Sequence, residues 1–113
     1  MLKYKEWAML PFQKDGDIET CYHLYPLRLR GFSEDKRNLV IEKLAEKDIA
    51  TNVHFIPLPM FTLYKNLGYD IKDYPNAFAQ YANEITLPLY STLTNEDAEY
   101  VAKELVKAVE SIL

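Results

Sequence analysis

The sequence predicts an α+β fold, in which a small antiparallel or mixed sheet carries helices packed on one of its faces. Short segments of strand character alternate with longer segments whose apolar residues recur at helical spacing. The chain has 113 residues, of which 49% are hydrophobic, and this is enough for one domain, 1–113, with a true core. The expected order is strand, helix, strand, short helix, helix, strand, helix.

The N-terminal quarter is expected to supply the first strands. Residues 9–12 are typical of an edge strand, because their proline lacks the amide hydrogen that a paired strand donates. Asp15-Gly16 is the strongest turn signal in the chain. Residues 21–29 alternate in character and form the first firm strand, and Pro26 predicts that one side of this strand is unpaired there.

The first long helix is predicted to begin after Ser33, a residue whose hydroxyl caps helix N-termini well. Acidic residues follow in the first turn, where the helix dipole favours negative charge. The helix ends around residues 47–48, and Asp48 occupies the position at which a left-handed residue is usual. Its buried stripe is formed by Val40, Ile41, Leu44 and Ala45.

The centre of the chain is predicted to be a second strand, residues 49–55, that leads into a stiff loop. Pro57 and Pro59 stop the strand because neither can donate a ladder hydrogen bond. His54 therefore lies at a rigid exit from a strand, where binding groups are often found. A short helix, residues 60–67, follows and ends at Gly68.

The C-terminal part is predicted to contain a helix over residues 75–84, opened by a proline, and a short strand over residues 85–89. The last helix begins at a Thr-x-x-Asp capping pattern that starts with Thr94. Its apolar face, which runs over about five turns, contains Ala98, Val101, Ala102, Leu105, Val109 and Ile112.

Composition excludes several classes of function. The net charge of −4 argues against electrostatic capture of nucleic acid or of an acidic membrane surface. No stretch of 18 apolar residues predicts a membrane span, and Met1–Trp7 lacks the apolar centre of a signal peptide, so the expected location is the cytoplasm. Cys21 is the single cysteine and fits a reducing compartment, either as a partly buried thiol or as a reactive one.

Signals of catalysis or metal binding are few. The chain has no Gly-rich phosphate loop and no Cys-x-x-Cys pair, and its two histidines are too far apart to predict a metal site. His23 is best explained as a hydrogen-bonded sheet histidine, whereas His54 is either structural or a group that binds a phosphate, hydroxyl or carboxylate. The nine tyrosines are either core and interface residues or a stacking surface.

Several sequence strings, in this order, carry a resemblance. They are Tyr22-His23-Leu24-Tyr25-Pro26-Leu27-Arg28-Leu29, Asn52-Val53-His54-Phe55-Ile56-Pro57-Leu58, Tyr74-Pro75-Asn76-Ala77, and Ile85-Thr86-Leu87-Pro88-Leu89-Tyr90 with Leu93-Thr94-Asn95-Glu96-Asp97. Together they resemble the small C-terminal domain of the DegT/DnrJ/StrS sugar aminotransferases. These are pyridoxal-phosphate enzymes of fold type I, and the likeness spans about residues 22–109.

The resemblance implies transfer of an amino group, usually from glutamate, to a keto group of a nucleotide-linked sugar in surface polysaccharide or antibiotic sugar biosynthesis. It also implies that the catalytic lysine and the pyridoxal phosphate site belong to a large domain not present in this chain, and that the family acts as a homodimer. No catalytic, cofactor-binding or metal-binding residue is therefore assigned here. His54 and Phe55 are the expected substrate-binding residues, and the family's second histidine falls on Pro59, so no contact is carried over for it.

Two functions of different classes follow from the sequence. The first is a fragment of a sugar aminotransferase, inactive alone, whose partners are the missing large domain, a second subunit and the nucleotide sugar. The second is an independent, non-catalytic module with the same fold, in which His54 and the tyrosines form a surface that binds a ligand or partner.

Overall fold

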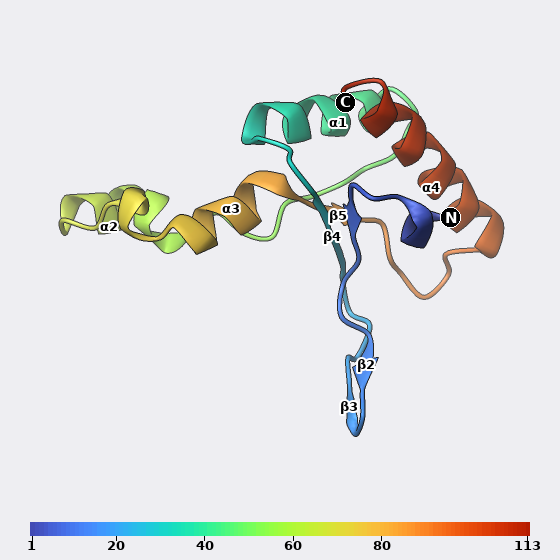
Figure 1. The fold of residues 1–113 in the computed structure, drawn as a ribbon, viewed down its shortest axis with the longest axis horizontal. Coiled ribbons are helices and arrows are strands. Elements are labelled where there is room, and N and C mark those ends of the chain that lie inside the picture. The colour runs from blue at the N-terminus through green and yellow to red at the C-terminus, as the bar shows by residue number, and fades with distance from the viewer.

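The computed structural model describes residues 1–113, which form a three-stranded sheet, a separate two-stranded hairpin and four α-helices (Figure 1). Short 3-10 turns at Leu2–Tyr4, Leu58–Met60 and Ile71–Asp73 complete the order of elements. The strands are β1 Ala8–Met9, β2 Lys14–Asp15, β3 Ile18–Glu19, β4 Tyr25–Leu29 and β5 Glu84–Leu87, and the helices are α1 Glu34–Ala45, α2 Thr62–Asn66, α3 Pro75–Asn83 and α4 Asn95–Glu110.

The main sheet has the order β1-β4-β5 and is antiparallel throughout, which confirms the predicted α+β class. Strand β4 lies in the centre. Pro26 pairs with Thr86 of β5, whereas β1 pairs with β4 only at Arg28 and Leu29. At Pro26 the edge of β4 that faces β1 is therefore unpaired, because proline has no amide hydrogen to donate there.

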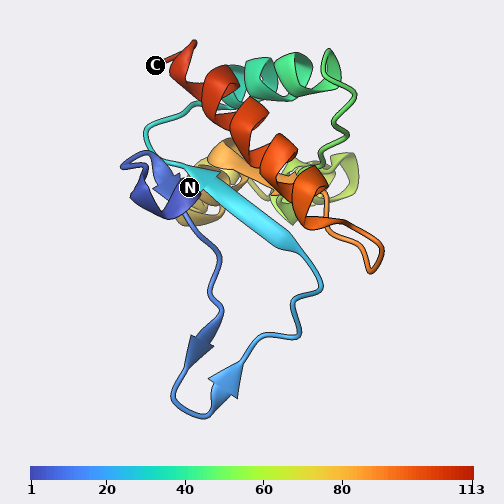
Figure 2. The same ribbon diagram turned by 90° about the vertical axis from the view of Figure 1, so that its right-hand side faces the viewer.

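The core lies between one face of this sheet and the two long helices, α1 and α4, which pack against each other as well (Figures 1 and 2). The sheet contributes alternate residues of β4 and β5 to it, as expected for strands with one apolar face. The central members of the core are Leu27, Leu29, Ile85 and Leu87 from the sheet, Val40 and Leu44 from α1, and Val101, Leu105 and Val109 from α4.

The long helices begin where the capping residues predict. The Ser33 hydroxyl accepts a hydrogen bond from the Lys36 amide at 3.4 Å, and the Thr94 hydroxyl accepts one from the Asp97 amide at 3.0 Å. Past the end of α1, Asp48 is in the left-handed region with φ 59°, as predicted from its position after the helix. These features depend on local sequence alone, which explains why they could be predicted.

The predicted strand over residues 49–55 is wrong. The segment pairs with β5 at a single bridge, in which Asn52 and Thr86 exchange backbone hydrogen bonds of 2.8 and 3.2 Å. Side chains take the next amide hydrogens, because the Asn52 carboxamide accepts from Val53 and the Glu84 carboxylate accepts from His54. A ladder cannot continue when its donors are used in this way.

The predicted start of the first strand, at residue 21, is also wrong. Tyr22 has φ 56°, a left-handed conformation that interrupts an extended strand, and β4 begins only at Tyr25. The Asp15-Gly16 signal is confirmed, because residues 16 and 17 connect β2 to β3 and Gly16 has φ 57°. The predicted short helix over residues 60–67 is present as the 3-10 turn Leu58–Met60 followed by α2.

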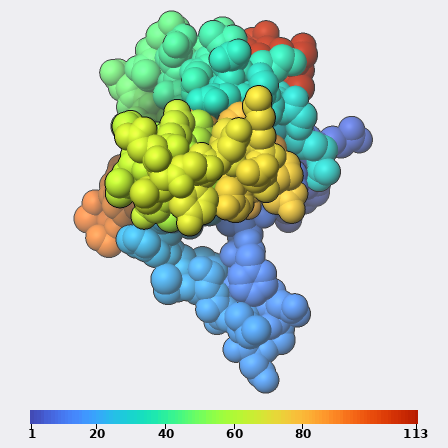
Figure 3. Space-filling model, turned by 90° about the vertical axis from the view of Figure 1, so that its left-hand side faces the viewer, coloured from blue at the N-terminus to red at the C-terminus, as the bar shows by residue number.

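Two parts of the chain project away from the core. The β2-β3 hairpin extends as an arm in one direction, and α2 with the beginning of α3 forms a lobe in another (Figures 1 and 3). The hairpin strands are exposed on both sides, and no residue of α2 is buried. In the sheet itself all four residues of β5 are buried, whereas Tyr25, Pro26 and Arg28 of β4 are half-buried.

Candidate functional site

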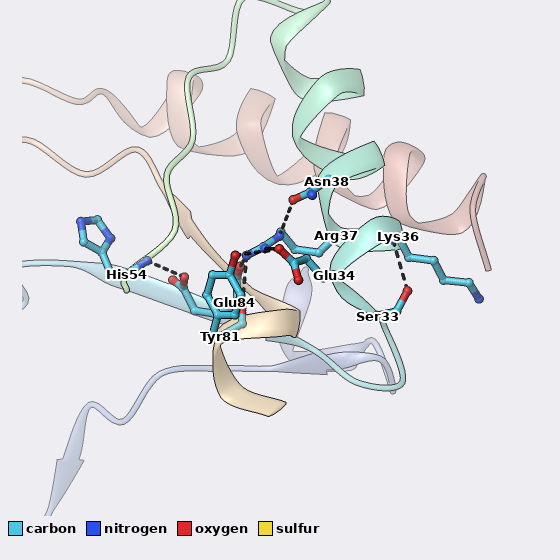
Figure 4. A network of polar contacts seen from close by, with 8 residues as sticks. All are labelled: Ser33, Glu34, Lys36, Arg37, Asn38, His54, Tyr81 and Glu84. Atoms are coloured by element: carbon cyan, nitrogen blue, oxygen red, sulfur yellow. Dashed lines mark hydrogen bonds and ion pairs between the residues drawn. The ribbon is translucent and has the colours of Figure 1, made fainter. Parts of the chain in front are cut away.

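His54 is attached to strand β5 on the face of the sheet opposite α1 and α4. The Asn52–Thr86 bridge positions the segment, and the His54 amide donates to the Glu84 carboxylate at 2.8 Å (Figure 4). The His54 imidazole lies 2.8 Å from the Thr86 hydroxyl through Nδ1. Both the backbone and the ring of this half-buried histidine are thus held in one orientation.

The two residues that hold His54 are buried on alternate positions of β5. Glu84 is fully buried and Thr86 is 6% exposed, and the Thr86 hydroxyl donates to Glu84 Oε1 at 2.5 Å. No cationic side chain pairs with the Glu84 carboxylate. Its oxygens instead accept hydrogen bonds from a hydroxyl and from a backbone amide, as a buried polar group requires.

A groove opens beside the imidazole, and we call it the His54 groove. Its lining is mostly apolar and comes from the loop after His54 and from α3, namely His54, Phe55, Ile56, Pro57, Leu58, Phe61, Ala77, Gln80 and Tyr81. Phe55 is 72% exposed and packs edge-on against His54, with ring centroids 4.5 Å apart. An exposed aromatic face next to a fixed polar group can stack a base or a sugar ring while the polar group orients it.

Arg37 connects helix α1 to the base of this site. Its guanidinium is 2% exposed and donates to the backbone carbonyls of Tyr81 and Glu84 at 3.0 and 3.1 Å (Figure 4). It also lies over the Tyr81 ring, 5.0 Å from the centroid. Arg37 therefore satisfies the carbonyls at the junction of α3 and β5 and fixes where Glu84 enters the sheet.

Tyr81 belongs to the same cluster. Its phenol donates to the Glu34 carboxylate at 2.7 Å. Burial, followed by this hydrogen bond to Glu34, raises the pKa of Tyr81 above its ordinary value of 10.0. The phenol therefore stays protonated at neutral pH and can act as a donor only to Glu34, which makes it a structural member of the groove wall.

The structure does not bring the second histidine into this site. His23 is exposed and lines a separate hollow on the same side of the sheet, together with Arg28 and the residues after β1. The two hollows share Gln80. The prediction of a hydrogen-bonded sheet histidine at His23 is wrong, because the residue precedes β4 and its ring has no hydrogen bond in the chain.

Sequence reasoning missed Glu84, Thr86 and Arg37. The sequence places Glu84 at the end of a predicted helix and Thr86 in an apolar strand, and neither position suggests a contact with a residue about thirty positions earlier. The signal that was available is the alternation Glu84, Ile85, Thr86, Leu87, which places two polar residues on one face of a short strand. Polar residues are common on the face of a strand that points away from the protein core. The pattern therefore predicts that Glu84 and Thr86 are buried only when the segment that covers this face is known.

The remaining titratable groups do not form a second site. No group of three His, Cys, Asp or Glu side chains is placed to hold a metal ion. All lysines are exposed except Lys5, which is half-buried and bonded to Glu110. No helix combines the length and the apolar character needed to cross a membrane.

Comparison with known proteins gives one consistent family. The sequence model of the DegT/DnrJ/EryC1/StrS aminotransferase family matches residues 2–106. A protein of Methanocaldococcus jannaschii of uncharacterised function is 38% identical over 94 residues, which is 81% of this chain and 24% of that protein. The spore coat polysaccharide biosynthesis protein SpsC of Bacillus subtilis is 31% identical over 106 residues, 91% of this chain and 26% of its own.

Solved structures with a similar fold are aminotransferases as well. The Streptococcus pneumoniae protein Spr1654, assigned as a sugar aminotransferase and solved in its PLP form, superposes with a TM-score of 0.91 at 42% identity and covers 95% of this chain and 27% of its own. Helicobacter pylori PseC, an aminotransferase of pseudoaminic acid biosynthesis, superposes with a TM-score of 0.83 at 27% identity over 97% of this chain and 29% of its own. The chain thus spans about a quarter of the length of the relatives that it matches.

Proposed function

The chain belongs to the DegT/DnrJ/EryC1/StrS aminotransferase family, and from this premise we propose that it forms the C-terminal small domain of an enzyme that aminates nucleotide-linked keto-sugars. The amino group comes from glutamate, and the product serves surface polysaccharide or antibiotic sugar biosynthesis. The proposal is supported by relatives that are sugar transaminases and by the match of this fold to about a quarter of their length.

In this proposal the small domain supplies one wall of the substrate site. The single observation that carries it is the fixed position of His54 at the rim of an apolar groove, next to the exposed ring of Phe55. Phe55 offers a surface for stacking and His54 a polar atom at a defined place. Together they would bind and orient the sugar nucleotide, and the groove wall would exclude water on that side.

The cofactor is a separate question, and the residues of this chain do not fit it. Pyridoxal phosphate needs a lysine in a sheltered site, but the lysines here are exposed apart from Lys5, which is bonded to Glu110. None of them lines the His54 groove. We therefore place the cofactor in the remainder of the full-length enzyme, on a large domain and a second subunit, and assign no chemical step to this chain.

The proposal predicts the kinetics of two substitutions in the full-length enzyme. His54→Ala and Phe55→Ala should each raise KM for the sugar nucleotide about tenfold, which corresponds to the loss of one hydrogen bond or one stacking contact. The half-reaction with glutamate should be unchanged, because the proposal assigns both residues to the binding of the sugar nucleotide alone. Leu39→Ala, at an exposed position of α1 that does not line the groove, is the matched control.

An unchanged KM in both variants would remove the groove from the substrate site. The alternative of an independent binding module predicts that the 113-residue chain alone binds the sugar nucleotide without any enzyme attached. A third outcome, a stable absorbance band of a lysine adduct with turnover by this chain alone after addition of pyridoxal phosphate, would contradict the placement of catalysis in the rest of the enzyme.

A further inference from the structure

We propose that Glu84 and Thr86 act as positioning residues that hold the His54 imidazole in the tautomer with its proton on Nδ1, so that Nε2 accepts a hydrogen bond from the ligand. The group recognised is then a hydroxyl or an amide N–H of the sugar, and not a phosphate or a carboxylate. The identity of the ligand rests on the proposed function, whereas the tautomer does not.

The argument begins at Thr86, whose hydroxyl has one hydrogen to donate. Its oxygen lies 2.5 Å from Glu84 Oε1 and 2.8 Å from His54 Nδ1. We take the Glu84 carboxylate to be ionised, and in that state it can only accept, so the hydroxyl hydrogen goes to Glu84. The contact between Thr86 and the imidazole then requires a hydrogen on Nδ1, which the ring donates to the hydroxyl oxygen.

The hydrogen bonds from His54 Nδ1 to Thr86 and from Thr86 to Glu84 form a chain that we call the relay, and its direction depends on Glu84. Glu84 is fully buried, and its other oxygen, Oε2, accepts the His54 backbone amide at 2.8 Å. With one oxygen accepting from the Thr86 hydroxyl and the other from the His54 amide, the ionised carboxylate accepts from both donors around it without a cation. The opposite direction would need a protonated Glu84 that donates to Thr86, with Thr86 donating to an unprotonated Nδ1, and the experiment below distinguishes the two.

The third step concerns the other ring nitrogen. His54 Nε2 has no hydrogen-bond partner in the chain, and it is not among the buried polar atoms that lack one, which are Trp7 Nε1 and Thr51 Oγ1. It is therefore accessible from the His54 groove that the residue lines. In a neutral imidazole whose Nδ1 carries the hydrogen, Nε2 is an acceptor, and a ligand group without a hydrogen to donate gains nothing from it.

The tautomer is measurable in the chain itself by long-range proton–nitrogen NMR of protein with 15N-labelled histidine, at a pH at which both imidazoles are neutral. His23 provides an internal reference in the same spectrum, because it is exposed and its ring has no partner. We expect the Nδ1–H form for His54 and the form preferred by a histidine side chain in water, Nε2–H, for His23. The Nε2–H form at His54 would overturn the proposal.

Two variants separate the relay from general effects on structure. Thr86→Val removes the hydroxyl and should return His54 to the Nε2–H form, whereas Thr86→Ser keeps the hydroxyl and should preserve the Nδ1–H form. Thr92→Val, an exposed threonine in the loop before α4, should change neither histidine. A His54 tautomer that is the same in all three variants would contradict a role for Thr86.

The full-length enzyme provides the functional readout. Thr86→Val should raise KM for the sugar nucleotide about tenfold, and Thr86→Ser should restore it to within about twofold, with the glutamate half-reaction unchanged in both. If the NMR result holds and KM does not move, the relay stands and the proposed substrate site fails. If KM moves but His54 is in the Nε2–H form, the relay fails and the site stands.

Discussion

Arg37 shows how a single residue sets the geometry of the candidate site without lining its groove. A buried guanidinium has five donors and must find acceptors for them. Here two of the acceptors are the backbone carbonyls of Tyr81 and Glu84, where helix α3 ends and strand β5 begins. The side chain of Glu84 in turn holds His54, so the position of the imidazole depends on a residue of α1.

Replacing Arg37 by Met tests this dependence. The substitution keeps much of the apolar volume but removes the guanidinium donors from both buried carbonyls, although the Tyr81 carbonyl still accepts from the Glu84 amide, so we expect a loss of about 3 kcal/mol in the free energy of unfolding. Urea unfolding followed by circular dichroism measures it. Lys43→Met, at an exposed position of the same helix, should stay within about 0.5 kcal/mol, and an equally small effect at Arg37 would contradict the structural role.

The site was only partly predictable for a reason that lies at this scale. His54 and Phe55 stand in a string that resembles a known family segment, so the sequence pointed to them directly. Their partners Glu84 and Thr86 are polar residues of a short strand, and nothing local shows which segment will cover them. Contacts between residues thirty positions apart depend on the packing of whole elements, which residue patterns do not encode.

At the scale of elements, helices could be predicted better than strands. Helix α4 has a capping threonine, acidic residues in its first turn and an apolar face, and all three signals lie within its own sequence. Residues 49–55 have equally good strand character, yet pairing fails because side chains of Asn52 and Glu84 take the amide hydrogens. A strand needs a partner whose donors and acceptors are free, and this is a property of the sheet.

The cap of α4 gives a prediction at the same scale. Thr94→Ala removes the acceptor of the Asp97 amide and should reduce the free energy of unfolding by about 1 kcal/mol. Thermal and urea unfolding measure the change, with Thr92→Ala, two residues earlier and outside the helix, as the control. Equal stability of Thr94→Ala and the control would show that solvent replaces the cap without cost.

At the scale of the whole molecule, the chain is less compact than its length allows. Its radius of gyration is 15.5 Å, whereas a compact domain of this length has a value of about 13 Å. The excess comes from the β2-β3 arm and the lobe that contains α2, which project from the sheet and its two helices (Figure 1). The lobe exposes large apolar side chains, among them Leu58, Phe61, Leu63 and Leu67.

This shape predicts an uneven distribution of stability that hydrogen exchange can measure. In the 113-residue chain, the amides of β4, β5 and the buried face of α4 should exchange slowly, because they open only with the core. The amides of β2, β3 and α2 should exchange orders of magnitude faster, since these elements bury no side chain and local opening exposes little apolar surface. Under the proposed function, the same amides should slow down in the full-length enzyme if its other parts cover the arm and the lobe. Uniform protection across the isolated chain would show instead that arm, lobe and core unfold as one cooperative unit.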